Sequence, residues 1–238
     1  MIARSTSRRF DDPKPHQVGS RILSSLLDPE SSILYPRPMK KLIPVSIGLR
    51  VKTGRAIAVL LRGPAAAPTV VKRGELMLAD SNEPDTWQPY HVVMDLPWDE
   101  AEQAVRKTAR VIGIAGSNAI SEWAREAKTS GFTISAVGIV AGSLQDPSKI
   151  GSPHIRAHAA EGKLYREALE KGADKLKLSR RCFAEDKLYE TVAAELGLSV
   201  ARLKERVSEF GAAVGRPWRV DEKAAAAAAW AVLGSSEF

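Results

Sequence analysis

Residues Lys41–Leu61 read KLIPVSIGLRVKTGRAIAVLL, and this stretch decides the fold that the sequence predicts. In its first half, apolar side chains alternate with small or polar ones, which is the period of a β-strand. The apolar positions are Val45, Ile47, Leu49 and Val51. Gly54 tolerates the positive φ of a tight turn, and residues 56–61 form an apolar run, as in a strand covered on both faces. We therefore expect a hairpin with its turn at residues 52–55.

The rest of the chain alternates between strand and helix patterns. A third strand is expected at Thr69–Leu78, so that the first three strands form an antiparallel meander. Asp80–Pro97 carries three prolines, and we expect a loop there because prolines at this density block a helix. The later elements are expected to be a helix at Asp99–Lys128, a strand at Phe132–Val140, a helix at His154–Leu169, a strand at Leu176–Phe183, and helices at Asp186–Leu196, Ser199–Val214 and Asp221–Leu233.

Two of these helices have unusual composition. Gly113 and Gly116 are costly inside a helix, so they predict either a break or close packing on the sheet. The last helix contains six consecutive alanines, residues 224–229, which favour a helix and permit close approach to a sheet. We also expect Ser199 to cap the helix that follows it.

Composition sets limits on the class of protein. The chain has 238 residues, of which 44% are hydrophobic, and no run approaches the roughly 18 apolar residues of a membrane span. Cys182 is the only cysteine, which excludes an intramolecular disulfide and a cysteine-rich zinc site. Arg8-Arg9 resembles part of a twin-arginine signal, but no apolar core follows it. We expect a soluble, cytoplasmic protein without membrane contact.

The net charge of +7 is unevenly distributed along the chain. Residues 1–41 hold eight basic and four acidic residues, a formal charge of +4, which leaves +3 for the other 197 residues. We expect residues 1–41 to be a basic, poorly ordered extension, with one short helix at Val18–Leu27, and residues 42–238 to be the folded domain. A basic protein can bind polyanions such as DNA or RNA. A basic surface that contacts only solvent explains the same charge.

The element order resembles that of the ribonuclease H-like fold, and in particular its RuvC-like resolvase branch and the related actin-like ATPases. VSIGLRVKTGRAIAVLL, residues 45–61, is similar to the opening strand and turn of that family. DEKAAAAAAWAVL, residues 221–233, is similar to its alanine-rich closing helix. The resemblance implies an α/β domain with a mixed five-stranded sheet and helices on both faces.

The sequence departs from this family at the acidic site. Nucleases of this fold use clustered carboxylates to hold two divalent cations. The first-strand carboxylate position corresponds here to Arg50, and the fourth-strand position falls near Val140 or Ala141. Asp221 is kept in the last helix, but the second acid is Ala224. The resemblance therefore implies a domain without two-metal hydrolysis at this place, and it puts nucleotide hydrolysis in doubt as well.

The hairpin turn is a candidate phosphate site. Lys52-Thr53-Gly54-Arg55 can offer backbone N–H groups and positive side chains to an anion. With Arg50, the side chains of Lys52, Thr53 and Arg55 are our candidates for binding nucleic acid or phosphate. The alternative is a plain hairpin turn.

A second candidate site begins at His154. On a helix, His154, His158 and Glu161 lie on one face at i, i+4 and i+7. With His91 from the proline-rich segment as a third imidazole, His154 and His158 can bind a metal ion. Alternatively, His158 acts as a general base oriented by Glu161, with Arg156 binding an anion. In the simplest alternative His154 caps the helix and His158 contacts solvent or the sheet.

These patterns support three hypotheses of function. The first is a non-catalytic DNA- or RNA-binding protein on a ribonuclease H-like domain that lacks the acidic two-metal site. The second is an enzyme that acts on a small anionic or phosphorylated substrate through the His/Arg/Glu site. The third is a scaffold whose basic extension docks onto an acidic partner. The cofactor, if there is one, and the oligomeric state do not follow from the sequence.

Overall fold

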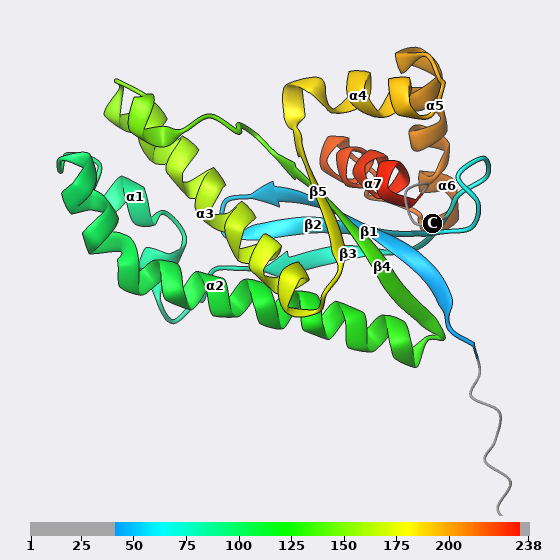
Figure 1. Ribbon diagram of the computed structural model, residues 1–238, viewed down its shortest axis with the longest axis horizontal. Coiled ribbons are helices and arrows are strands. Elements are labelled where there is room, and N and C mark those ends of the chain that lie inside the picture. Colours follow the sequence, from blue (N-terminus) through cyan, green and yellow to red (C-terminus); the bar gives the residue numbers. More distant parts are fainter. Residues whose placement is uncertain (1–40, 234–238) are drawn as a thin grey trace, which may run out of the picture. The chain divides into compact units, whose positions relative to one another are not determined.

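A computed structural model describes residues 41–233, which form a five-stranded mixed sheet (Figure 1). The strand order is β3-β2-β1-β4-β5. β1 is antiparallel to β2, which is antiparallel to β3, while β4 runs parallel to both β1 and β5. The strands are β1 (Ile43–Lys52), β2 (Arg55–Arg62), β3 (Thr69–Met77), β4 (Phe132–Ala141) and β5 (Ser179–Ala184). This order and these directions are those of the ribonuclease H-like fold. The extension expected over residues 1–41 lies outside the described residues except for Lys41.

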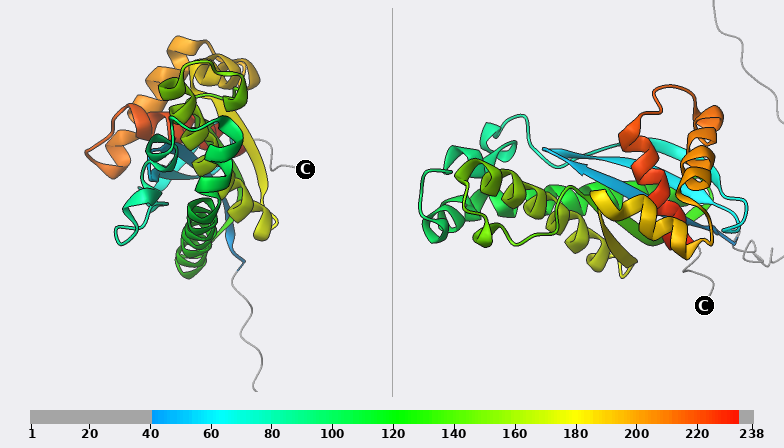
Figure 2. Two further views of the ribbon diagram at one scale, coloured as in Figure 1. Left: turned by 90° about the vertical axis from the view of Figure 1, so that its left-hand side faces the viewer. Right: turned by 90° about the horizontal axis from the view of Figure 1, so that it is seen from above.

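Helices cover both faces of the sheet, as the resemblance implied (Figures 1 and 2). One face is covered by α2 (Trp98–Thr129) and α3 (Pro153–Lys175). The other face is covered by α7 (Val220–Leu233), with α4 (Leu188–Glu195) and α5 (Val200–Glu209) packed against it. The one-turn helix α6 (Gly211–Val214) connects α5 to the segment before α7. None of the helices in residues 41–233 combines the length and the apolar character needed to cross a membrane.

The two faces of β1 carry different side chains because the helices approach them to different depths. The apolar series that begins with Val45 belongs to the core beneath α2 and α3. The small and polar residues of the alternation face α7, where the Ser46 hydroxyl donates to the Ala229 carbonyl oxygen at 2.7 Å. A Cβ atom added to Gly48 would lie only 1.8 Å from the Ala225 carbonyl oxygen. The alternation in the sequence thus records two different helix contacts, and β1 is buried on both faces.

The alanine run lets α7 lie directly on the sheet. All of residues 224–233 are buried, and a Cβ at Gly138 of β4 would lie 2.4 Å from the Ala228 carbonyl oxygen. Glycines on β1 and β4 and alanines on α7 therefore bring the helix backbone against the strand backbone. As a result the start of α7 lies close to the carboxyl end of β1.

α2 is one continuous helix of 32 residues, without the break that its glycines made possible. Gly116 does mark a close approach, but the partner is α3 and not the sheet as expected. A Cβ at Gly116 would lie 2.8 Å from the Ala168 backbone, and one at Gly172 of α3 would lie 3.1 Å from the Gly116 carbonyl oxygen. Gly113 has open space around its Cα.

The segment Asp80–Pro97 contains two short helical turns, where a loop was expected. They are the 3₁₀ turn η1 (Pro84–Thr86) and the one-turn helix α1 (Pro89–Val92), and each has a proline in its first turn. A proline there removes no hydrogen bond, since the first N–H groups of a helix are unpaired anyway. The Tyr165 hydroxyl lies 2.6 Å from the Trp87 carbonyl oxygen and anchors this segment to α3.

Element boundaries differ from the expected ones by a few residues. α3 continues past Leu169 to Lys175, and β5 begins at Ser179 because its pairing with β4 begins there. Ser199 caps α5 as predicted, its hydroxyl oxygen accepting from the Arg202 N–H. The remaining 3₁₀ turns are η2 (Pro147–Lys149) and η3 (Glu185–Lys187).

Candidate functional site

Arg50 lies near the carboxyl end of the central strand, with Val140 of β4 as its register partner. Its side chain is 8% exposed, and its Nη2 lies 2.5 Å from Glu185 Oε2. Its Nε lies 3.7 Å from Asp221 Oδ1, and its Nη1 donates to the Val51 carbonyl oxygen at 2.8 Å. The guanidinium is therefore a fixed cation between two carboxylates from different elements.

The other positions of the expected acidic site carry no charge. Val140 and Ala141 are fully buried at the end of β4, and Ala224 is 3% exposed in α7. Asp221 is therefore the only acid left at the positions that the resemblance assigns.

Glu185 is a site residue that the sequence reasoning missed. It is the first residue of η3, directly after β5, whose parallel pairing with β4 places its carboxyl end at the same edge of the sheet as Arg50. In open α/β sheets, functional groups gather at the carboxyl ends of the strands. An acid directly after the last parallel strand was the signal that could have found it.

Three of the four predicted phosphate-binding residues pair with carboxylates. Lys52 Nζ lies 3.4 Å from Asp221 Oδ1, so Lys52 and Arg50 share that carboxylate. Arg55 Nε lies 3.7 Å from Glu75 Oε2 on β3. Thr53 is exposed at the turn. Arg50 and Lys52 are thus brought together, while Arg55 belongs to a neighbouring ion pair.

A groove of about 670 Å³ at the start of α7 is lined by three further cations. We call Arg216, Arg219 and Lys223 the α7 rim. Trp218 forms the apolar side of the groove. Within residues 41–233 none of the three charged groups is paired with a carboxylate. Arg219 and Lys223 flank Asp221 in the sequence, which was the available signal for a set that the sequence reasoning did not propose.

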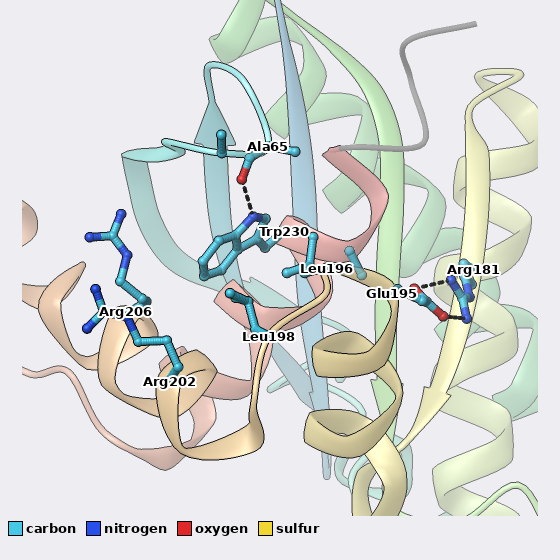
Figure 3. A pocket seen from close by; sticks show the side chains of 10 residues that line it. Ala65, Arg181, Glu195, Leu196, Leu198, Arg202, Arg206 and Trp230 are labelled. Carbon is cyan, nitrogen blue, oxygen red and sulfur yellow. Dashed lines mark hydrogen bonds and ion pairs between the residues drawn. The ribbon is translucent and has the colours of Figure 1, made fainter.

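A larger pocket, of about 930 Å³, lies between the β2–β3 loop, α5 and the end of α7 (Figure 3). Arg202 and Arg206 lie side by side on one wall, and on another wall Trp230 Nε1 donates to the Ala65 carbonyl oxygen at 2.8 Å (Figure 3). Both arginines pair with glutamates on α5, and Arg181 pairs with Glu195 at the far side of the pocket. Its arginines are therefore largely neutralised, unlike those of the α7 rim.

The three histidines of the second candidate site do converge. His91 comes from α1, whereas His154 and His158 lie one turn apart at the start of α3. The ring centroid of His91 is 5.2 Å from that of His154 and 4.4 Å from that of His158. The Nε2 atoms of His154 and His158 are 3.2 Å apart. Partial burial, together with the nearby His91 and His154 rings, lowers the pKa of His158 below its usual value.

Glu161 does not orient His158, which was one expectation from the sequence. Its side chain is 3% exposed, and its Oε1 lies 2.8 Å from His91 Nδ1. The same oxygen accepts from the backbone N–H groups of Tyr90 and His91, each at 3.2 Å. Arg156 lies apart from the three rings, with its guanidinium carbon 6.0 Å from the centroid of the Trp98 ring. The Glu161 carboxylate of α3 therefore binds α1.

Among residues 41–233, the hydrogen-bond partner of Cys182 is a carboxylate. Its Sγ donates to Glu170 Oε1 at 2.8 Å, and burial together with this carboxylate raises the pKa of the thiol to about 12. A thiol with that pKa is protonated at neutral pH, and only the thiolate is a good nucleophile. Cys182 is part of the packing beneath α3.

No protein-family model matches the chain, and the search of curated proteins gives no match. Among solved structures the chain is similar to RuvC of Thermus thermophilus in complex with a Holliday junction substrate, at a TM-score of 0.47 and 11% identity. That likeness covers 79% of this chain and 90% of the other. A further structure of Thermus thermophilus RuvC has a TM-score of 0.47 and 9% identity, over 79% of this chain and 92% of the other. The fold assignment rests on the strand order and register of the sheet.

Proposed function

We propose that this protein binds nucleic acid through the α7 rim and the neighbouring Lys52, and that it does not hydrolyse nucleic acid at the end of the sheet. One observation carries the proposal: the Arg50 guanidinium is held between Glu185 and Asp221, at the place where nucleases of this fold hold divalent cations. The domain has the architecture of a phosphodiester-cutting enzyme, and a fixed organic cation lies where its metal ions belong.

The Arg50 charge opposes metal binding at this place. A divalent ion about 4 Å from a guanidinium is repelled by about 8 kcal/mol at an effective dielectric constant of about 20. Glu185 and Asp221 are already paired with Arg50, and the strand beside it offers only Val140 and Ala141. The two-metal mechanism needs several carboxylates to offset such repulsion, and they are missing here.

The α7 rim supplies the attraction for a polyanion. Its three cations are unpaired within the described part of the chain, and Lys52 shares its carboxylate with Arg50. A phosphate that contacts a lysine or arginine displaces condensed counterions, so each contact contributes about 0.9 to the slope of log K against log salt. Three contacts at the rim correspond to a slope change of about 3.

The test is fluorescence anisotropy with labelled single-stranded, duplex and branched DNA and RNA over a salt series. The triple variant Arg216→Ala, Arg219→Ala, Lys223→Ala is expected to bind at least tenfold more weakly, with a salt slope reduced by about 2–3. The matched control removes the same charge from the exposed face of α2, through Arg106→Ala, Lys107→Ala and Arg110→Ala. We expect this control to bind within threefold of the unaltered protein.

Two results would contradict the proposal. One is the absence of binding to any of these nucleic acids at low salt, where phosphate contacts are strongest. The other is cleavage of a labelled strand with Mg²⁺ or Mn²⁺ present that disappears in Asp221→Asn, since this would place a working metal site beside Arg50.

A further inference from the structure

The strongest unassigned feature of the described chain is the cluster of His91, His154 and His158. One nitrogen from each ring is available within 4.8 Å of the others, and the rings come from two separate elements. Three imidazoles that lie edge to face offer nitrogen lone pairs to one small volume. Such a volume suits a cation that accepts nitrogen ligands.

The contacts of Glu161 select the nitrogen that His91 presents. Its carboxylate accepts from Nδ1–H of His91, so the lone pair of that ring is on Nε2. This Nε2 is buried and has no hydrogen-bond partner among the described residues. A carboxylate behind a histidine is the arrangement that fixes the tautomer of a metal ligand and raises its basicity.

The spacing of the rings fits a tetrahedral ion. With Zn–N bonds of about 2.0–2.1 Å, two ligand nitrogens in a tetrahedral site lie about 3.3–3.4 Å apart. The Nε2 atoms of His154 and His158 are 3.2 Å apart. Two ligands from consecutive helical turns and a third from another segment are also a common way to build such a site.

The donor set decides between metals. The cluster offers three imidazole nitrogens and no coordinating oxygen or thiolate, and Mg²⁺ and Ca²⁺ require oxygen ligands. Imidazole suits zinc and its neighbours in the first transition row. We propose that His91, His154 and His158 bind one Zn²⁺ ion, that Glu161 orients His91, and that a water molecule takes the fourth position.

The site also has a structural consequence. Its ligands join α1 to α3 across a gap of more than 60 residues, so the ion fastens the proline-rich segment to the first turn of α3. Among residues 41–233 no hydrogen bond or ion pair links this cluster to Arg50 or Asp221. The two proposals rest on different residues, so the failure of one leaves the other standing.

The experiment is a calorimetric titration of the metal-free full chain with Zn²⁺, together with visible spectra of the Co²⁺ form. We expect one ion per chain, tetrahedral Co²⁺ bands, and a melting temperature that rises with the Zn²⁺ concentration. His154 and His158 lie on the exposed side of the cluster. His154→Ala and His158→Ala are each expected to lower the affinity for Zn²⁺ at least tenfold. The control is His16→Ala, the remaining histidine of the chain, which is expected to leave the titration unchanged.

Glu161 is a positioning residue, and its variant tests that role. Glu161→Gln is expected to keep the tetrahedral Co²⁺ spectrum and the one-to-one stoichiometry while Zn²⁺ affinity falls 10- to 100-fold. Absence of Zn²⁺ binding by the unaltered chain at tens of micromolar would overturn the proposal. So would Zn²⁺ binding that His154→Ala and His158→Ala leave unchanged, since the ion would then be held elsewhere.

Discussion

At the residue scale, Arg50 combines a structural and a functional role. Its side chain is 8% exposed, while those of Glu185 and Asp221 are 43% and 32% exposed. Solvent screens the two carboxylates, so their attraction to the Arg50 guanidinium is weaker than the attraction within a fully buried ion pair. Removing the guanidinium would nevertheless leave Glu185 without its cation and Asp221 paired with Lys52 alone. The residue therefore links β1 to η3 and α7 at this edge of the sheet, where we propose that its charge opposes metal binding.

A substitution at this residue can recreate the missing metal site. Arg50→Asp places a third carboxylate beside Glu185 and Asp221, and we expect the free energy of unfolding to fall by roughly 2–4 kcal/mol because the three acids repel one another. Millimolar Mg²⁺ is expected to restore part of this loss. Melting temperatures measured with and without Mg²⁺ check the prediction, with Arg50→Met as the control that removes the cation without adding an acid. A melting temperature of the unaltered protein that rises equally with Mg²⁺ would refute it.

At the element scale, the contact between α7 and the sheet depends on the absence of side chains. Gly48 and Gly138 lie directly beneath backbone carbonyl groups of the alanine run. This close approach brings Asp221, in the first turn of α7, to Lys52 and Arg50 of β1. The geometry of the candidate site is therefore a consequence of helix–strand packing several residues away from it.

Two glycine substitutions distinguish the effect of this helix–sheet contact on stability from the effect of helix propensity. Gly48→Ala is expected to lower the free energy of unfolding by about 3 kcal/mol or more, because its new methyl group would overlap the Ala225 backbone. In Gly113→Ala, the new methyl group in α2 has open space around it. This substitution is expected to raise the free energy of unfolding by about 0.5–1 kcal/mol. Urea denaturation curves measure both changes. Equal stability of Gly48→Ala and the unaltered protein would mean that α7 is farther from β1 than described.

At the scale of the whole molecule, residues 41–233 contain two hydrophobic clusters. Both hydrophobic clusters draw their residues from Val45 to Leu233, on the two faces of one sheet. The basic residues that precede this domain contribute to the net charge. Stability and long-range electrostatic attraction should therefore be separable by truncation.

Deleting residues 1–40 is expected to leave the melting temperature within about 2 °C of that of the full chain, because both hydrophobic clusters of residues 41–233 are retained. The deletion removes seven basic and four acidic residues, so binding to duplex DNA at low salt is expected to weaken and its salt slope to decrease. Thermal melts and the anisotropy salt series measure the two effects. A melting temperature lowered by more than about 5 °C would show that the deleted residues stabilise the domain.

The sequence by itself determined the strands, the order of the elements and hence the fold, because hydrophobic periodicity and turn residues are local properties. It also placed Arg50 in the first strand, and it selected His91, His154 and His158 as members of one candidate site. Only the tertiary structure decided which groups meet. Glu161 and His91 lie 70 positions apart, and Arg50 reaches Glu185 only because β5 pairs with β4. Such contacts depend on how helices and strands pack, and local patterns indicate which faces are buried but not which distant side chains meet.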